Sequence, residues 1–249
     1  PDFKYSQDAL SQQCWSSDSR GSYFSTAVGC DNKLWRADLE GRLAPLEQPS
    51  SHTVFLGAAQ AGERIALQAA SPTQAPNLQA GLLKKIEPIT EFNPDLQTRV
   101  PYQYQLARWS HPDGTELEGV FFLPTKGRMP CPCIVIPHGG PHVRTPAVLT
   151  PDALVFLDAG IAIFLPNYRG SSGYGQAFID ADRGDWGGKD FEDIQCGIDA
   201  LIGKGVIDEK KLGIWGPSYG GFMTSWTITQ TKRFRAASVG AGVTNLMSF

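Results

Sequence analysis

The stretch Leu212–Gly221 (LGIWGPSYGG) decides the fold of this chain. Its first part, Leu212–Trp215, is a continuous apolar run typical of a buried parallel strand, and Gly220–Thr231 continues with a helical pattern. The letters between them follow the G-x-S-x-G spacing of a sharp strand-to-helix turn centred on Ser218. The sequence therefore predicts a nucleophile elbow, with Ser218 as the attacking residue.

The glycines that flank the serine, Gly216 and Gly220, have a steric explanation. Because the chain reverses sharply at Ser218, the backbone there is expected to be strained, and side chains two positions to either side would collide. The turn also places the hydroxyl at a helix N-terminus, whose dipole favours developing negative charge. The alternative is a glycine-rich turn in which Ser218 serves as the helix N-cap, and the strand-then-helix setting favours the nucleophile.

Strand and helix patterns alternate around this turn. Further buried strands are predicted at Cys133–Pro137, Ile161–Leu165 and Ala236–Val239, and helices at Pro151–Ala159 and Lys189–Ile202. A hairpin with its turn at Asp113-Gly114 is predicted to join Tyr102–Trp109 to Leu117–Leu123. Because alternating strands and helices build parallel sheets through right-handed crossovers, the predicted fold class is α/β, of the α/β-hydrolase type.

A second motif, His138–Pro141 (HGGP), directly follows the strand predicted at Cys133–Pro137. In α/β-hydrolases one oxyanion donor is the N–H after the nucleophile, here Tyr219, and the other comes from a loop after an earlier strand. Gly140 is the candidate for that second N–H, and such a donor typically contributes about 10²–10³ in rate. Since the catalytic base of this fold follows the nucleophile in sequence, we expect His138 to brace the loop and not to act as the base.

Residues 1–86 show short apolar alternations between turn clusters, the spacing of consecutive β-strands. Ser19–Phe24 aligns with Gln60–Ile65, an offset of 62 − 21 = 41 residues between their glycines. A period of about 40–45 residues with several short strands in each unit suits the blades of a β-propeller. A fragment of an ordinary β-sandwich is the alternative.

Composition excludes several classes of function. With 22 Lys plus Arg and 25 Asp plus Glu, the formal net charge of −3 gives no reason to expect nucleic acid or an anionic membrane as a partner. No apolar run approaches the roughly 18 residues of a membrane span. The five cysteines are irregularly spaced and include Cys131-Pro132-Cys133. This spacing predicts free thiols in a reducing, cytoplasmic compartment and no metal site, and a Cys14–Cys30 bridge is the alternative for an exported protein. No cofactor is predicted.

Four motifs occur in a fixed order: His138–His142 (HGGPH), Asn167–Gly175 (NYRGSSGYG), Asp185–Gly188 (DWGG) and Gly216–Gly221 (GPSYGG). Together they resemble the prolyl oligopeptidase family of serine peptidases, especially its acylaminoacyl-peptidase-like members. In that family a β-propeller precedes the hydrolase domain and filters access to the active site. The resemblance therefore implies that 1–86 are the last blades of a propeller and that 87–249 are the N-terminal part of a hydrolase domain.

The resemblance also implies the chemistry of the site. Ser218 is expected to form an acyl-enzyme with short peptides, with the N–H groups of Tyr219 and Gly140 as oxyanion donors. Arg169 is expected to pair with Asp190 or Asp193. In the family the catalytic Asp and His lie well beyond the elbow, whereas no histidine follows His142 here, so we expect a chain truncated at both ends. The alternatives are an esterase or lipase on the same fold, or a catalytically inert fragment.

Overall fold

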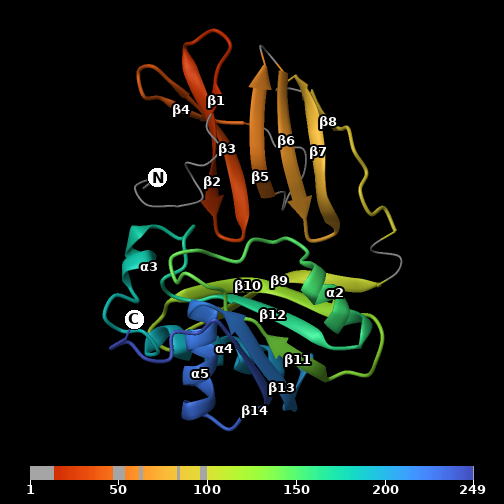
Figure 1. Cartoon of the computed structure of the whole chain (residues 1–249), viewed down its shortest axis with the longest axis vertical. Helices are drawn as coiled ribbons and strands as arrows, with labels where there is room; N and C mark the ends of the chain where they lie inside the picture. The colour runs from red at the N-terminus through yellow and green to blue at the C-terminus, as the bar shows by residue number, and fades with distance from the viewer. Residues whose placement is uncertain (1–13, 47–53, 62–63, 83–84, 96–99, 249) are drawn as a thin grey trace. The chain divides into compact units, whose positions relative to one another are not determined.

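The computed structural model describes residues 14–46, 54–61, 64–82, 85–95 and 100–248. The chain divides into two compact units (Figure 1): one contains 1–99 together with 146–149, and the other contains 100–145 together with 150–249. Among the described residues, no helix has the length and apolar character needed to cross a membrane.

The first unit contains two four-stranded antiparallel sheets, each with its strands in chain order. The first sheet comprises β1 (Cys14–Trp15), β2 (Gly21–Val28), β3 (Asp31–Asp38) and β4 (Leu43–Pro45). The second comprises β5 (Val54–Ala61), β6 (Arg64–Ser71), β7 (Gln74–Leu82) and β8 (Lys85–Pro88). Strand β6 begins 64 − 21 = 43 residues after β2, and β7 begins 74 − 31 = 43 residues after β3. The two sheets therefore repeat as predicted, but at an offset of 43 residues instead of 41.

Strand β7 was not predicted from the sequence, because polar residues occupy its buried positions. Of its residues, Asn77 and Gln79 are buried, so the alternation of apolar and polar residues that identifies a strand is absent. The Asn77 side chain accepts hydrogen bonds from the Phe92 N–H at 2.6 Å and the Thr90 hydroxyl at 3.1 Å. Among the described residues of this unit, Leu34, Ile65, Leu67 and Ala69 form a buried apolar cluster.

The second unit contains one six-stranded sheet of order β14-β13-β11-β12-β10-β9. Its strands are β9 (Tyr102–Ser110), β10 (Glu116–Pro124), β11 (Cys131–Val135), β12 (Ala162–Asn167), β13 (Ile207–Pro217) and β14 (Phe234–Gly240). Strands β14, β13, β11 and β12 run parallel to one another. The hairpin of β9 and β10 joins this sheet through β10, which pairs antiparallel with β12. This arrangement confirms the predicted α/β-hydrolase fold class.

The helices of this unit are α2 (Pro151–Asp158), α3 (Gln176–Asp180), α4 (Lys189–Gly203) and α5 (Tyr219–Gln230). Of these, α2, α4 and α5 were predicted, whereas the single-turn α3 was not. Helix α4 contacts β9 and β13, and α5 contacts β13 and β14. The core is closely packed beneath α4, where the rings of Trp109 and Phe164 meet edge to face at 5.3 Å.

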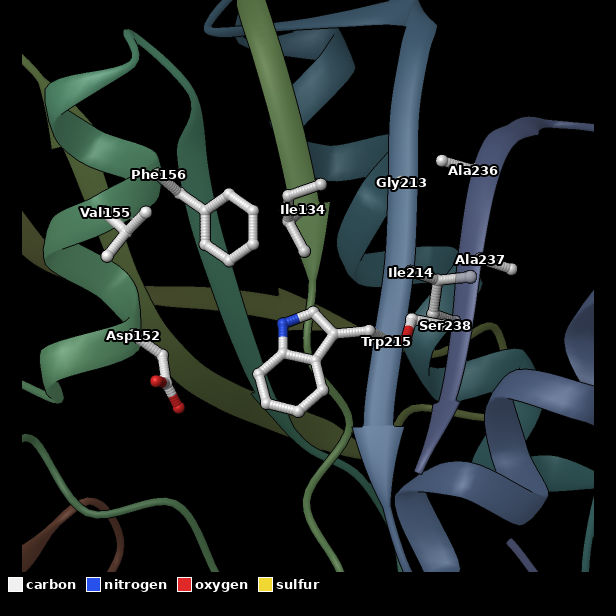
Figure 2. A pocket seen from close by; sticks show the side chains of 10 residues that line it. All are labelled: Ile134, Asp152, Val155, Phe156, Gly213, Ile214, Trp215, Ala236, Ala237 and Ser238. Atoms are coloured by element: carbon white, nitrogen blue, oxygen red, sulfur yellow. The ribbon is translucent and has the colours of Figure 1, made fainter. Parts of the chain in front are cut away.

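An apolar pocket of about 450 Å³ lies between α2 and the strands β11, β13 and β14 (Figure 2). Its lining includes Phe156 of α2 and Trp215 of β13, whose side chains both appear in Figure 2. Trp215 lies three residues before Ser218, but Ser218 does not line the pocket. The pocket is therefore separate from the predicted nucleophile.

Two glycines of α4 offer a test of this packing. A Cβ at Gly197 would lie 2.7 Å from Cζ of Phe164 and 2.9 Å from Cε2 of Trp109, whereas a Cβ at Gly203 would meet nothing within 4 Å. We expect Gly197→Ala to lower the free energy of unfolding by about 1–3 kcal/mol through overpacking. Gly203→Ala should leave it unchanged or raise it by up to about 1 kcal/mol. Urea unfolding measures both, and equal stabilities of the two variants would contradict the packing described.

Candidate active site

Ser218 lies at the junction of β13 and α5 and is exposed. Its φ of 56° and ψ of −121° lie in a region that non-glycine residues rarely occupy. Its N–H donates to the Gly240 carbonyl of β14 at 2.8 Å, and its own carbonyl accepts from the Phe222 N–H at 3.0 Å. Ser218 occupies the N-cap position of α5, but its side chain makes no capping hydrogen bond. The turn thus holds the Ser218 backbone in a strained conformation, with the residue exposed.

The glycines around Ser218 are required by close backbone contacts. A Cβ at Gly216 would lie 2.6 Å from the Pro137 carbonyl oxygen and 2.8 Å from the carbonyl group of Gly220. A Cβ at Gly220 would collide with the same Pro137 oxygen. The predicted collision is confirmed, and the segment after β11 contributes to it as well as the turn itself.

The loop that follows β11 reaches the elbow. A Cβ at Gly139 would lie 3.4 Å from Cβ of Ser218 and 4.0 Å from its Oγ. The next residue, Gly140, is exposed and has a φ of 113°, which favours glycine. Since β11 and β13 are parallel neighbours, their carboxyl ends lie at the same edge of the sheet. The fold thus brings the two predicted motifs together.

His138 braces this loop, as predicted. Its Nε2 lies 2.8 Å from the Ser171 hydroxyl, and its ring stacks on Tyr168 with 4.4 Å between centroids. The Tyr168 hydroxyl donates to the His138 carbonyl at 2.6 Å. Burial lowers the pKa of His138 to about 4, so its imidazole is neutral at pH 7.

The other histidines of the described part also have partners. His142 Nε2 lies 3.2 Å from an oxygen of Asp182. His111 is buried between Asp113, at 2.9 Å, and Glu192, at 3.0 Å, although the sequence predicted no specific partner for it. His52 lies outside the described residues. Each described histidine therefore has a polar partner other than Ser218.

The side chain of Tyr219 is buried below the elbow, and its hydroxyl donates to Oδ2 of Asp190. Burial raises the pKa of the Asp190 carboxyl to about 6, and it also raises the pKa of the Tyr219 phenol above its ordinary value. The sequence allowed Asp190 as a partner of Arg169. In the structure Asp190 faces the elbow and binds Tyr219 instead. The backbone N–H of Tyr219 is at the first position of α5, where a helix offers it no internal acceptor.

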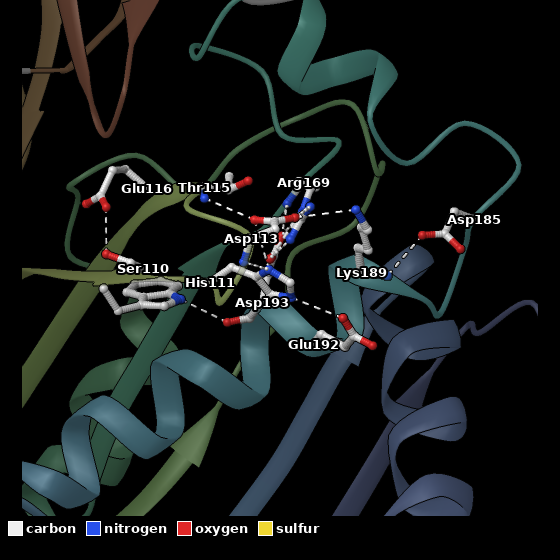
Figure 3. Close-up of polar contacts among 11 residues, drawn as sticks. Ser110, His111, Asp113, Thr115, Glu116, Arg169, Asp185, Lys189, Glu192 and Asp193 are labelled. Carbon is white, nitrogen blue, oxygen red and sulfur yellow. Dashed lines mark hydrogen bonds and ion pairs between the residues drawn. The ribbon is translucent and has the colours of Figure 1, made fainter.

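Arg169 lies at the centre of an ionic network (Figure 3), in which Arg169 and Asp193 are buried and Asp113 reaches the surface. Its guanidinium donates to both oxygens of Asp193, with distances from 2.7 to 3.1 Å, and to Asp113 at 2.7 Å. The predicted partner Asp193 is confirmed, whereas Asp113 was missed because it lies on the turn between β9 and β10, 56 residues away. The one sequence signal for such a network was the pair of carboxylates at positions 190 and 193, on the buried face of an amphipathic helix.

The sheet order, the elbow and the facing glycine loop define an α/β-hydrolase fold. Residues 149–249 match the model of the prolyl oligopeptidase family. Similar curated proteins include the peptidase YuxL of Bacillus subtilis, which is 31% identical over 94% of this chain and 36% of that protein. The chain belongs to the prolyl oligopeptidase family.

Other relatives agree with this assignment. The acylamino-acid-releasing enzyme of Rattus norvegicus is 26% identical over 91% of this chain and 33% of its own length. The acylaminoacyl peptidase of Pyrococcus horikoshii has a TM-score of 0.80 at 25% identity, over 90% of this chain and 36% of its own. A puromycin-hydrolyzing peptidase of Mycobacterium tuberculosis has a TM-score of 0.79 at 28% identity, over 95% and 38% respectively. This chain spans about a third of the length of these relatives.

The Arg169 network can be tested with a substitution that retains the charge. Because a lysine ammonium cannot reproduce the forked contact with buried Asp193, Arg169→Lys should lower the free energy of unfolding by about 2–4 kcal/mol. The control is Arg183→Lys, at a side chain that is 76% exposed and paired with Asp180; it should change stability by less than about 0.5 kcal/mol. Similar losses in both variants, measured by urea unfolding, would show that burial of the network is unimportant.

The raised pKa of Asp190 predicts a pH dependence of stability. A carboxyl whose pKa rises from 3.8 to about 6 on folding contributes stability below pH 4 that is lost as the pH rises through 6. Relative to Asp190→Asn, the wild type should lose about 2 kcal/mol of unfolding free energy between pH 4 and pH 7. Asp208, whose pKa is lowered by hydrogen bonding to the Lys210 N–H, provides a control of opposite sign through Asp208→Asn. If the unfolding free energy of wild type and of Asp190→Asn changed equally with pH, the raised pKa of Asp190 would be disproved.

Proposed function

We propose that the protein is a serine peptidase that cleaves short peptides through an acyl-enzyme on Ser218. The observation that carries the proposal is the strained, exposed Ser218 beside the loop at Gly139. In this reaction Oγ attacks the scissile carbonyl carbon, the hydroxyl proton passes to a general base, and the departing amine receives a proton from that base. Water then hydrolyses the ester and restores the Ser218 hydroxyl.

The N–H groups of Tyr219 and Gly140 are the proposed oxyanion donors. Both residues lie on the edge of the sheet where β11 and β13 end, and the proximity of Gly139 to Ser218 supports their convergence. The dipole of α5 adds to this, because Ser218 lies at its N-terminus. Such groups stabilise the negative charge of the tetrahedral intermediate, which is where this class of site has its largest effect.

The general base is proposed to follow the elbow in the complete protein. In α/β-hydrolases the order is Ser, then Asp or Glu, then His, whereas all four histidines of this sequence precede Ser218. A serine without its base is a weak nucleophile at neutral pH. We therefore propose that these 249 residues alone hydrolyse peptides slowly, and that Ser218 acts efficiently only together with a downstream Asp and His.

The domain assignment is also a proposal. The repeat of 43 residues supports the interpretation of 1–86 as propeller blades, and the elbow supports 87–249 as the first part of a catalytic domain. Because similar proteins are named acylamino-acid-releasing enzymes, N-acylated short peptides are the first substrates to test. No nucleic acid or membrane partner is proposed, and the cytoplasmic compartment is a prediction from the cysteine pattern alone.

A fluorophosphonate probe tests the nucleophile in the protein expressed from its complete gene. We expect the probe to label Ser218, because phosphonylation requires both an activated hydroxyl and the oxyanion donors. Ser218→Ala should abolish labelling, whereas Ser225→Ala, which removes a hydroxyl elsewhere on α5, should label like the wild type. Peptide mass spectrometry identifies the labelled site, and a folded wild type that remains unlabelled would refute the proposal.

A comparison of substrates separates the peptidase from the esterase alternative. The same protein is given an N-acylated peptide amide and a simple ester, and kcat/KM is measured for each. The proposal expects turnover of the amide that disappears in Ser218→Ala. Turnover of the ester alone would favour the esterase or lipase.

A further inference from the structure

The hydrogen bond between Tyr219 and Asp190 connects the elbow to the start of α4. Tyr219 and Asp190 are 3% and 1% exposed, respectively. The bond joins residues 29 positions apart and is closed to solvent. The two oxygens of Asp190 accept from the Tyr219 hydroxyl and from the Phe191 N–H, so the pair requires an explanation other than direct chemistry at Ser218.

Tyr219 has two ends with different surroundings. Its backbone N–H belongs to the strained turn after Ser218, and its ring is enclosed by other aromatic rings. Trp186 meets this ring edge to face at 4.9 Å, Phe222 lies at 5.2 Å and Tyr168 at 6.1 Å between centroids. The hydroxyl is then fixed by Asp190. With the ring enclosed and its far end bonded, the orientation of the whole residue is restricted, its peptide N–H included.

Asp190 is itself held rigidly. It lies in the first turn of α4, where a negative side chain suits the helix dipole. The backbone N–H groups of Gly187 and Phe191 also donate to its carboxylate. The Gly187 carbonyl in turn accepts from Nε1 of Trp226 at 2.6 Å. The segment before α4 is thus bonded to α5 at one point and supports the Tyr219 hydroxyl at another.

From this geometry we propose that Asp190 is a positioning residue for the oxyanion hole, which acts through the Tyr219 phenol to hold the Tyr219 N–H in place. The proposal rests on the proposed function of Ser218 and extends it by one residue. Catalytic donors must be held within about 0.5 Å of their productive geometry. The backbone of Ser218 is held by Gly240 and Phe222, and an anchor on the next side chain fixes the donor that follows it. The motif Asp185–Gly188 supports both Tyr219 and Asp190, because it contains Trp186, which packs on the Tyr219 ring, and Gly187, whose N–H donates to Asp190.

Three substitutions separate positioning from charge. Tyr219→Phe removes the donor, Asp190→Ala removes the acceptor, and Asp190→Asn keeps an acceptor oxygen without the charge. Tyr219→Phe and Asp190→Ala should each slow phosphonylation of Ser218 by about tenfold, a part of the 10²–10³ that complete loss of a donor causes. In peptide hydrolysis kcat should fall with KM nearly unchanged. Asp190→Asn should restore most of the rate, and the double variant should be no slower than either single one.

Thr224→Val is the matched control for a general loss of stability. It removes another buried hydrogen bond of α5, from the Thr224 hydroxyl to the Gly220 carbonyl at 2.7 Å. Thermal unfolding shows whether it destabilises the protein as much as Asp190→Ala does. An equal fall of kcat in Thr224→Val, additive losses in the double variant, or a wild-type rate in Asp190→Ala would each overturn the proposal.

A second readout does not depend on activity. In protein labelled with ¹⁵N-tyrosine, the amide signal of Tyr219 is identified by its disappearance in Tyr219→Phe. Asp190→Ala should shift or broaden this signal, whereas Thr224→Val should leave it in place. An unchanged signal in Asp190→Ala would overturn the positioning role even in an active enzyme. A changed signal in a protein whose Ser218 never reacts would retain that role and refute the proposed function.

Discussion

The strained backbone of Ser218 is the constraint on which the arrangement of the hydrolase unit depends. A non-glycine residue at positive φ costs on the order of 1–3 kcal/mol, and it persists only where its neighbours hold it. Here the Gly240 carbonyl of β14 accepts the Ser218 N–H, and the first hydrogen bond of α5 holds its carbonyl. Strand β14 must therefore lie beside β13, and α5 must start directly after the serine. Gly216 and Gly220 follow from the same constraint, since the turn presses both against the carbonyl of Pro137.

Two carboxylates on the buried face of α4 are stabilised by different kinds of partner. Asp190 and Asp193 are one turn apart, and burial raises the pKa of both. Asp193 is compensated by the Arg169 guanidinium, which also binds Asp113 and so ties the β9–β10 turn to the helix. Asp190 accepts instead from neutral donors, the Tyr219 phenol and the N–H groups of Gly187 and Phe191. One carboxylate therefore supports the scaffold through a full ion pair, and the other lies under the elbow with its pKa near 6.

The first unit illustrates a different way of building sheets. Its repeat of 43 residues produces two similar sheets, and an apolar cluster among its described residues has four buried members. Polar side chains occupy inward positions of β7, where Asn77 binds the chain after β8. Hydrogen bonds of side chains to the backbone thus replace part of the apolar packing. For the same reason this strand lacked the alternation from which a strand is recognised.

The sequence by itself determined the parts of this protein that depend on short stretches. The run Leu212–Trp215, the glycines of the elbow and the loop at Gly140 were recognisable because strand, turn and helix preferences act over a few neighbouring residues. The proximity of Gly139 to Ser218, the pairing of Tyr219 with Asp190 and the reach of Arg169 to Asp113 were decided only by the tertiary structure. The physical reason is that these contacts join residues tens of positions apart. Which buried carboxylate meets which donor depends on the face that each helix turns toward the sheet, and the spacing of residues along the chain does not specify it.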